Sequence, residues 1–429
     1  MRHRTLHWCV ALVIVFSESE NGLLQKQSLL PVHHEESHGE AVFRPWPLDS
    51  LRAPPRGQPR VAHLTSDHTA MDSRIFYKEC RSLSRAGYQV TLVAPHTDDI
   101  EIDGVSIKAI RPPETRWTRL SRTLIEILRL ATKVDADLYH LHDPELLPIG
   151  LWLRGRGKAV IYDVHDDFPA LASISNYHPF EGPLRPFPAY FIRRMENLAA
   201  PRMSAIVAAD ETLGMRFAAL NDKCFIIHNL PMPEELAPIV PVPWHRRACA
   251  VAYVGTFTTW RGLGEMVQAM DYVPKKLDCK LLLVGTMKDQ YRKLIAELPG
   301  YERVQLIGRV DRAGVRDILS SVRAGLSVAH PLPFVTLTWP IKIFEYMAAG
   351  IPVVASDFPL WRELLGRPPA GMFVNPLDPK SIANAIEYVL CEPSSAERMG
   401  LLGRRAVEER WNWSGEEQSL IRLYWDLFQ

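Results

Sequence analysis

The segment "WPIKIFEYMAAGIPVVAS", residues Trp339–Ser356, combines a helix-forming stretch with the start of a β-strand. Pro340 suits the first turn of a helix, Gly350 suits the position just after its end, and a β-branched run follows. The pattern predicts a helix that leads directly into a buried strand. Packing does not explain Lys342 and Glu345, which are three residues apart and therefore neighbours on one helical face near the positive end of the helix dipole.

The same alternation of strand and helix patterns runs through the chain from Arg60 onward. Strand-like runs include "RVAHLTS", "YQVTLVA", "DADLYHLH", "KAVIYDVH" and "SAIVAA" in the first half, and "ACAVAYVG", "KLLLVG", "RVQLIG" and "AGLSVA" in the second. Asp103-Gly104 lies between β-prone flanks and predicts a hairpin. Repeated βα units predict parallel sheets with helices on both faces. We therefore expect an α/β protein with two doubly wound Rossmann-like domains facing each other across a cleft.

Five prolines within residues 231–247 separate the two halves, and prolines fit neither a regular helix nor a central strand. We interpret this segment as a Pro-rich linker between an N-terminal domain at 59–230 and a C-terminal domain at 248–410. Residues 1–58 are rich in polar residues and show no sustained period, so we expect a poorly ordered extension. Residues 411–429 are predicted to form a final helix.

The 429-residue chain has an ordinary apolar fraction and a net charge of +1. This balance gives no reason to expect a nucleic-acid partner, so any polyanion site must be local. The six cysteines include no CxxC pair, which indicates free thiols in a reducing compartment. The apolar run Trp8–Phe16 is too short to span a bilayer and lacks an A-x-A cleavage signal. We expect a cytoplasmic protein, with the inner membrane face as a second option.

Polar residues gather where predicted strands of the first half end, which is where ligands of open parallel sheets bind. In "HLHDPEL", Asp143 suits a helix N-cap, and His142 beside it fits packing and ligand contact equally well. In "YDVHDDFP", a hydrophobic strand ends at His165 among three aspartates. An imidazole at that position can donate, accept or carry a proton near neutral pH.

In the second half, "YVGTFTTWRGL" ends a strand at Gly255 and begins a helix just after Arg261. Backbone at such a glycine can approach an anion, and a guanidinium can pair with phosphate through two hydrogen bonds. No Walker lysine motif or dinucleotide G-x-G-x-x-G follows any predicted strand.

Several of these motifs occur in the order found in a known enzyme family. They are "DSRIFYKECRSLSRAGYQVTLVAP", "HLHDPELLPIG", "YDVHDDFP", "YVGTFTTWRGL", "IKIFEYMAAGIPVVAS" and "WNWSGEEQSLIRLYWDLF". From Arg60 to its end the chain resembles the family-four retaining glycosyltransferases of the two-Rossmann (GT-B) type. The resemblance implies that the second domain binds a nucleotide-diphosphate sugar, and that the first presents a hydroxyl of a glycan or lipid-linked saccharide, as in polysaccharide biosynthesis. It also implies that no metal or other cofactor is needed, and that the final helix crosses back to the first domain.

The resemblance also implies roles for particular residues. Glu345 would hydrogen-bond the ribose, Arg261 would bind the diphosphate, and His165 would touch the transferred sugar near the reacting carbon. The catalytic set is then His165, Lys342 and Glu345. The donor site adds Gly255, Thr256, Gly308 and Arg309 to Arg261, Lys342 and Glu345, and the acceptor side has Arg74, His142 and Glu145.

The chain departs from the family pattern at the second carboxylate. Many members have a glutamate eight residues before Glu345, where this chain has Leu337. Thr256 also stands where many members have a basic residue. We hypothesise that Lys342 supplies part of the missing positive charge.

A basic segment at residues 115–133 bears on location. Its apolar positions are Trp117, Leu120, Leu124, Leu128 and Ala131, and its basic ones are Arg116, Arg119, Arg122, Arg129 and Lys133. The favoured interpretation is a surface helix packed on the sheet, and the alternative is a helix whose outer arginines touch anionic lipid.

Three other readings remain open at this point. A nucleotide-sugar epimerase would share the architecture, and a binding protein without turnover would explain the missing carboxylate. A metallohydrolase would use histidines and aspartates of "HLHD" and "DVHDD" as ligands, namely His140, His142, Asp143, His165 and Asp166. That last reading leaves Arg261 and Glu345 without a role.

Overall fold

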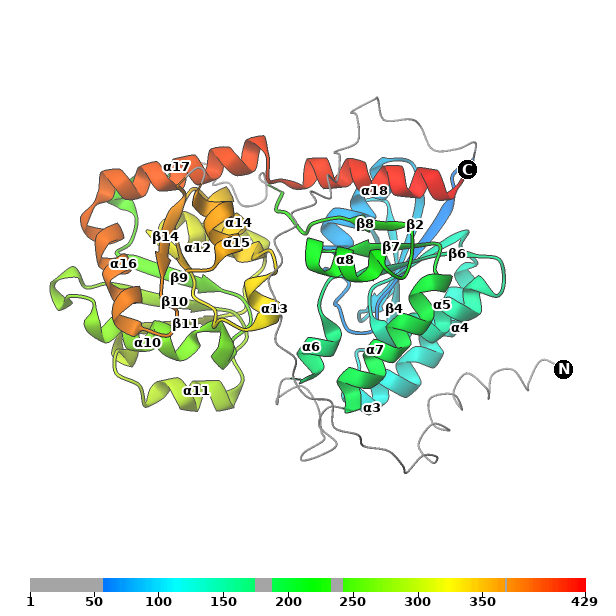
Figure 1. Ribbon diagram of the computed structural model, residues 1–429, viewed down its shortest axis with the longest axis horizontal. Helices are drawn as coiled ribbons and strands as arrows, with labels where there is room; N and C mark the ends of the chain where they lie inside the picture. Colours follow the sequence, from blue (N-terminus) through cyan, green and yellow to red (C-terminus); the bar gives the residue numbers. More distant parts are fainter. Residues whose placement is uncertain (1–56, 174–186, 233–241, 367–368) are drawn as a thin grey trace, which may run out of the picture.

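The structure is a computed structural model that describes residues 57–173, 187–232, 242–366 and 369–429. Most of the expected N-terminal extension and the middle of the expected linker lie outside the described residues. Two sheets organise the described chain, each covered by helices on both faces, and they lie side by side in Figure 1. The two-domain α/β fold predicted from strand and helix alternation is confirmed.

The first sheet has eight strands in the order β3-β4-β2-β1-β5-β6-β7-β8 among the described residues. They are β1 Arg60–Leu64, β2 Gln89–Pro95, β3 Ile100–Ile102, β4 Val105–Ile110, β5 Leu138–Leu141, β6 Ala159–Val164, β7 Ala205–Ala208 and β8 Cys224–Ile226. Only β3 and β4 pair antiparallel, through the predicted turn, where Asp103 and Gly104 have φ of 51° and 75°. The strand order runs both ways from the β1/β5 pair, which therefore marks the switch point where ligands of such sheets bind.

The second sheet has six described strands in the order β11-β10-β9-β12-β13-β14, and the pairs are parallel. They are β9 Ala250–Val254, β10 Lys280–Val284, β11 Val304–Gly308, β12 Ala324–Ser327, β13 Val353–Ser356 and β14 Gly371–Val374. Here the switch point lies between β9 and β12. The helix and strand predicted over the opening segment are α14, Ile341–Ala348, and β13, with Gly350 at a φ of 69° just after the helix.

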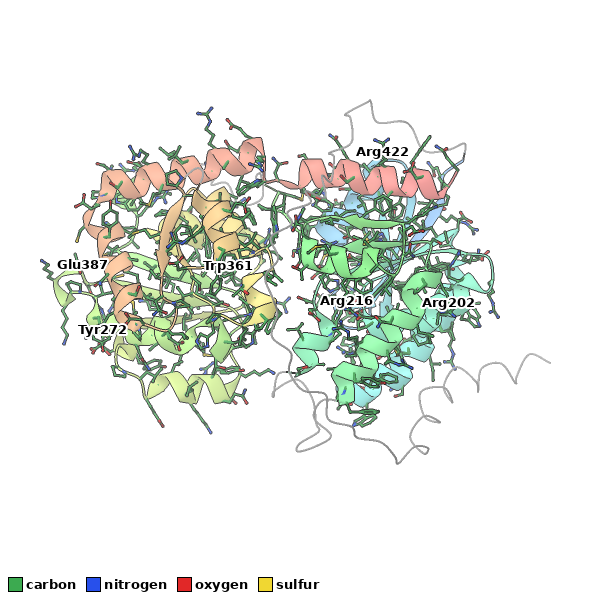
Figure 2. The ribbon with its side chains drawn as sticks, viewed as in Figure 1. Arg202, Arg216, Tyr272, Trp361, Glu387 and Arg422 are labelled. Carbon is green, nitrogen blue, oxygen red and sulfur yellow. The ribbon has the colours of Figure 1, made fainter. Side chains whose placement is uncertain are left out.

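Helical elements fill the connections. In the first domain these are η2 Ile75–Cys80, α2 Arg81–Arg85, α3 Arg116–Thr118, η3 Arg119–Thr123, α4 Leu124–Val134, η4 Pro144–Leu146, α5 Leu147–Arg154, α6 Phe168–Ser173, α7 Phe187–Ala199, η6 Ala200–Arg202 and α8 Glu211–Ala218. In the second they are η7 Trp244–Arg246, η8 Thr259–Arg261, α10 Leu263–Tyr272, η9 Lys275–Leu277, α11 Asp289–Ala296, η10 Tyr301–Arg303, α12 Arg312–Ser321, α13 Pro333–Thr336, α15 Pro359–Gly366, α16 Pro379–Cys391 and α17 Pro393–Glu409. In Figure 2 Trp361 of α15 points into the second domain, where it is buried.

The final helix, α18 Trp413–Leu427, packs on the first domain although it follows the second in sequence (Figure 1). Trp413, Leu420 and Tyr424 belong to the same buried cluster as residues of β1 and η2. The Trp413 indole donates a hydrogen bond to Ser82 Oγ at 3.0 Å. The last helix is therefore part of the first domain's core.

The basic segment follows its predicted amphipathic pattern at Leu124, Leu128 and Ala131, which pack on the core of the first domain, but departs from it at its start. Trp117 and Leu120 are 70% and 41% exposed, whereas Thr123, Ile127 and Ala131 form the buried face. The change coincides with η3, a π-helical stretch, and the wider turn of a π-helix rotates the residues before it relative to those after it. Among the described residues, no helix is long and apolar enough to cross a bilayer.

Candidate active site

Glycines open the carboxyl edge of the second sheet. Gly255, just after β9, has a φ of 136°, and Gly285, just after β10, has a φ of 143°. A Cβ on Gly255 would lie 2.7 Å from the Cε and Nζ of Lys342, and one on Gly285 would lie 2.2 Å from the Gly255 carbonyl oxygen. The positive φ of both residues and the backbone contact at Gly285 favour glycine, and the absence of a side chain at Gly255 leaves bare backbone directly beside the lysine.

Lys342 lies in the first turn of α14, with Nζ 5.5 Å from the centroid of the Tyr253 ring. Burial and the nearby charge of Arg261 together lower the pKa of Lys342 to about 7, although Glu345 acts in the opposite direction. Lys342 and Glu345 lie three residues apart on α14, and the Arg261 guanidinium lies within electrostatic range of the lysine. Among the described residues no carboxylate lies within ion-pair distance of Lys342 Nζ.

Arg261 ends η8, and its guanidinium lies 4.6 Å from the centroid of the Trp260 ring. Its Nε is buried and has no hydrogen-bond partner in the described part of the chain. The next residue must be glycine for two reasons. Gly262 has a φ of 74°, and a Cβ there would lie 2.1 Å from the carbonyl oxygen of Val328. The turn therefore fixes the place of a guanidinium that retains an unused donor.

Glu345 has a partner that the sequence patterns missed. Arg312, the first residue of α12, donates from Nη1 to Glu345 Oε1 at 2.9 Å. No short-range signal connects residues 33 positions apart. The other predicted donor-site residues border the same edge: the Thr256 carbonyl accepts a hydrogen bond from the Tyr253 hydroxyl at 2.8 Å, and Gly308 and Arg309 are exposed at the end of β11.

His165 follows β6 in the first domain and contacts a histidine that the sequence patterns also missed. Its Nε2 lies 3.0 Å from Nε2 of His68, and its Nδ1 is buried with no hydrogen-bond partner in the described part. Burial and the nearby charge of His68 lower the pKa of His165 to about 4. Burial alone would also lower the pKa of His68, but Asp72 and Asp143 outweigh it and raise that pKa to about 9. At neutral pH a protonated His68 therefore donates to a neutral His165, whose proton lies on Nδ1.

Asp143 precedes η4 as predicted, but its side chain caps no helix. Its carboxylate instead accepts from Thr65 Oγ1 at 2.8 Å and from the backbone N–H of Ser66 at 2.7 Å. Glu145, a predicted acceptor-site residue, accepts from Ser66 Oγ at 2.7 Å and pairs with Arg119 Nε at 2.9 Å. Asp143 and Glu145 therefore connect the loop after β1 to the start of η4.

The acceptor roles expected for Arg74 and His142 need correction. Arg74 is 3% exposed, and it donates to both carboxylate oxygens of Asp163 and to the carbonyl of Ile227. His142 is fully buried beneath the loop. Neither side chain can reach an acceptor, because both are packed inside the domain.

The carboxyl edges of the two sheets face each other. Asp166, next to His165, has its pKa raised to about 6 by partial loss of water, and the charges of His68 and Arg261 oppose that rise. Arg261 comes from the other domain, so the two edges are electrostatically coupled. Direct contacts also join the domains: Thr212 Oγ1 donates to the Leu337 carbonyl at 3.3 Å, and the rings of His228 and Trp339 lie 4.1 Å apart.

Comparisons with known proteins agree with this geometry. Residues 73–230 match the sequence profile described as Glycosyltransferase Family 4, and residues 247–405 match the profile described as Glycosyl transferases group 1. The chain belongs to the family-four glycosyltransferases of the GT-B type. This glycosyltransferase is 26% identical over 352 residues to the phosphatidyl-myo-inositol mannosyltransferase of Mycobacterium leprae. The aligned region covers 79% of this chain and 88% of the relative. The Mycolicibacterium smegmatis protein of that name is 24% identical over 80% of the chain and 86% of its own length.

Solved structures share the fold of the glycosyltransferase. Sucrose-phosphate synthase from Thermosynechococcus elongatus matches with a TM-score of 0.70 at 19% identity, over 86% of this chain and 99% of its own. The Anabaena protein HepE, solved with UDP-glucose, matches with a TM-score of 0.64 at 14% identity, over 85% and 98% of the two chains. At these identities the likeness concerns the fold alone.

Proposed function

We propose that this glycosyltransferase moves a sugar from a nucleotide-diphosphate sugar to a hydroxyl acceptor with retention of configuration. The observation that carries the proposal is the Lys342 and Arg261 pair at the glycine-lined edge of the second sheet. Lys342 lies beside the open backbone of Gly255 and has no carboxylate within ion-pair distance among the described residues, and the Nε donor of Arg261 has no partner in that part of the chain. A diphosphate is the ligand class that matches two converging cations and free backbone.

The transfer chemistry follows from this charge distribution. Breaking the sugar–phosphate bond develops negative charge on the departing diphosphate and positive charge on the sugar. Lys342, Arg261 and the N-terminus of α14 would stabilise the first of these charges, and removing one such donor costs on the order of 3 kcal/mol. Glu345, held by Arg312, would accept hydrogen bonds from the ribose, and His165 would contact the sugar from the other domain. None of these roles requires a metal.

Thermal-shift assays with UDP-, GDP- and ADP-sugars test the donor site. A ligand at a hundred times its dissociation constant stabilises a protein by about 2.7 kcal/mol, so the correct donor should raise the melting temperature clearly. We expect Lys342→Ala to abolish that rise. Lys380→Ala is a matched control, because Lys380 also stacks on a tyrosine, 5.3 Å from the Tyr272 ring, at the outer side of the same domain. Equal donor binding by Lys342→Ala would contradict the proposal, and sugar interconversion without acceptor would indicate an epimerase.

We further propose that the acceptor is lipid-linked and that the enzyme reaches it from the inner membrane surface. Large apolar side chains are exposed at one end of the first domain, where Figure 1 places α3 and the start of α7: Trp117, Leu120, Phe187 and Tyr190. Four arginines are also exposed on α7 and on the helical elements that follow α3, namely Arg122 of η3, Arg129 of α4, and Arg193 and Arg194 of α7. Aromatic and basic side chains together suit an anionic membrane surface. The mycobacterial relatives are named phosphatidyl-myo-inositol mannosyltransferases, and that name supports the choice of a lipid-linked acceptor.

Vesicle sedimentation tests the membrane proposal. Binding should require anionic lipid, weaken with salt, and fall when Trp117 and Leu120 are both changed to serine. Sedimentation that is independent of lipid charge, or unchanged in this variant, would contradict it.

A further inference from the structure

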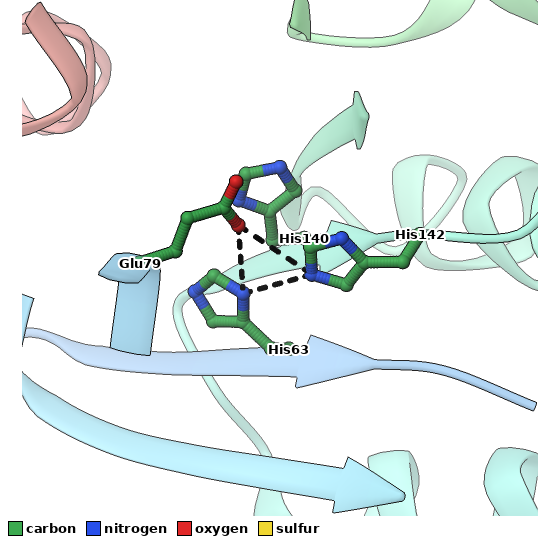
Figure 3. A group of neighbouring side chains, drawn as sticks. All are labelled: His63, Glu79, His140 and His142. Atoms are coloured by element: carbon green, nitrogen blue, oxygen red, sulfur yellow. Dashed lines mark hydrogen bonds and ion pairs between the residues drawn. The ribbon is translucent and has the colours of Figure 1, made fainter. Parts of the chain in front are cut away.

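A second cluster of chemically active side chains lies beneath the first-domain edge, inside the core. It consists of His63 on β1, Glu79 on η2, and His140 and His142 on and just after β5, all fully buried (Figure 3). The donor and acceptor roles described above do not use this cluster. Burying three imidazoles and a carboxyl group together is costly unless each polar atom has a partner.

The ligand atoms converge with metal-site spacing. His63 Nδ1 lies 2.9 Å from His142 Nε2, and Glu79 Oε2 lies 3.7 Å and 3.8 Å from these two nitrogens. A point equidistant from the three atoms is about 2 Å from each, which is the usual length of Zn–N and Zn–O bonds. His140 completes the group, since one ligand atom from each of the four residues lies within 4.8 Å of the others.

The cluster also contains buried polar atoms that lack partners. Both carboxylate oxygens of Glu79 and Nε2 of His140 are buried without a hydrogen bond in the described part of the chain. Glu79 Oε1 lies 3.0 Å from Arg74 Nε, so that oxygen has an ion pair. Glu79 Oε2 instead points at the two imidazole nitrogens, which share a hydrogen bond with each other, so a cation there would replace the shared proton and give Oε2 a partner as well.

The outer nitrogens of both central histidines face oxygen atoms. His63 Nε2 lies 3.1 Å from the Tyr424 hydroxyl, and His142 Nδ1 lies 3.3 Å from Asp163 Oδ2 in a close contact that lacks hydrogen-bond geometry. Metal-binding histidines usually donate their other N–H to such oxygens, which fixes the ring and its tautomer. Arg74 in turn holds Asp163 through two hydrogen bonds.

The backbone that carries Glu79 is also unusual. The N–H of Glu79 donates to the carbonyl of Arg74, five residues earlier, as expected in a π-helix. Single π turns inside helices occur frequently at functional sites. Here the wider turn places Glu79 opposite β1 and β5.

We propose that His63, Glu79 and His142 bind a divalent transition-metal ion of the zinc class, with His140 as the neighbouring candidate for a fourth ligand. The ion is structural: it joins β1, η2 and β5 and reaches α18 through Tyr424. It takes no part in the proposed sugar transfer. It also differs from the ligand set of a metallohydrolase, because Asp143 and His165 turn toward His68 and the loop after β1.

Metal analysis of the full-length chain tests the proposal. Protein expressed in zinc-supplemented medium should contain about one zinc ion per chain, and Glu79→Gln and His142→Asn should each lower this to roughly a tenth or less. His96→Asn is the control, since His96 lies in the same domain outside the cluster and should leave the zinc content unchanged. Zinc retained by both cluster variants would overturn the proposal.

A second measurement on the wild-type chain covers the case in which the variants fail to fold. Protein stripped of metal with a chelator should melt several degrees lower and recover on adding one equivalent of zinc. Added Co²⁺ should give the visible absorption of a tetrahedral site with nitrogen and oxygen ligands. The proposal would be overturned if wild-type protein is purified without metal, its melting temperature does not change on adding zinc, and Co²⁺ gives no visible band. The cluster would then be only a hydrogen-bonded core.

Discussion

Lys342 illustrates how surroundings set the charge of one side chain. Burial and the nearby Arg261 guanidinium both disfavour the ammonium form, and the carboxylate of Glu345 only partly compensates. With a pKa of about 7, the lysine is only partly charged at neutral pH. A bound diphosphate would favour the charged form and raise the pKa again. The residue is therefore poised to take up a proton as its proposed ligand binds.

This coupling predicts a pH-dependent donor affinity. As pH rises above 7, the dissociation constant of the nucleotide sugar should increase, by up to about tenfold per pH unit, because the free enzyme must gain a proton to bind. Isothermal titration calorimetry in buffers of different ionisation enthalpy should detect the proton uptake. Lys342→Arg keeps its charge and should remove both the slope and the uptake. A slope that persists in this variant would assign the effect to another group.

The His68 and His165 pair makes a second prediction at this scale. If protonated His68 fixes the tautomer of His165, His68→Asn should lower kcat by roughly tenfold or more while leaving donor affinity unchanged. The wild-type rate should also fall as pH rises through about 9, where His68 loses its proton. Steady-state kinetics over a pH series measure both effects. A variant with normal kcat, or with a defect only in donor binding, would contradict this role.

At the scale of elements, α18 shows that sequence order and domain membership differ. The helix follows the second domain, yet its buried face completes the core of the first, where Trp413 is 2% exposed. The Tyr424 hydroxyl lies 2.7 Å from His140 Nδ1 and also contacts His63. The helix therefore contributes both apolar burial and hydrogen bonds to a domain built from residues more than 180 positions earlier.

Truncating the buried indole should destabilise the protein strongly. We expect Trp413→Ala to lower the free energy of unfolding of the first domain by about 3–5 kcal/mol, through lost apolar burial and a cavity. Gln418→Ala, on the exposed face of the same helix, should change it by less than about 0.5 kcal/mol. Urea unfolding compares the two variants, with far-UV circular dichroism as the signal because it does not depend on tryptophan fluorescence. Similar stabilities for both variants would show that α18 is not part of the core.

At the scale of the whole molecule, His228 links three parts of the structure. Its Nε2 lies 3.1 Å from Glu211 of α8, its Nδ1 lies 3.1 Å from Glu416 of α18, and its ring lies 4.1 Å from Trp339 of the second domain. Burial would lower the pKa of His228, but the two glutamates outweigh it and raise the pKa to about 9. The imidazolium therefore stabilises the junction of the two domains.

The raised pKa gives a definite direction to the pH dependence of stability. Because the folded pKa is about 9 and the unfolded value about 6.5, the contribution is fully present below pH 6.5 and is lost as pH rises toward 9. Its size is on the order of 2 kcal/mol after allowing for the exposure of Glu211. Melting temperatures across this range should fall more steeply for wild-type protein than for His228→Asn. Parallel pH profiles would contradict the assignment.

The sequence alone was sufficient for the two-sheet architecture, the Asp103-Gly104 hairpin and the helix-to-strand unit at residues 339–356. These features depend on local rules: hydrophobic period, glycine and proline positions, and turn chemistry. Motif order was likewise enough for the enzyme family. The burial of Arg74 and His142, in contrast, could not be read from the sequence, because whether a polar side chain at a strand end faces inward depends on the layers above it.

Only the tertiary structure decided which side chains meet. Arg312 reaches Glu345 across 33 residues, and His68 reaches His165 across 97, because parallel strands bring distant loops to one edge. The π-helical turns of η2 and η3 likewise give side-chain positions that differ from those of a regular α-helix. In η2, Glu79 lies opposite three histidines. Such pairings depend on angles and distances between whole elements, and a linear pattern of residues contains neither.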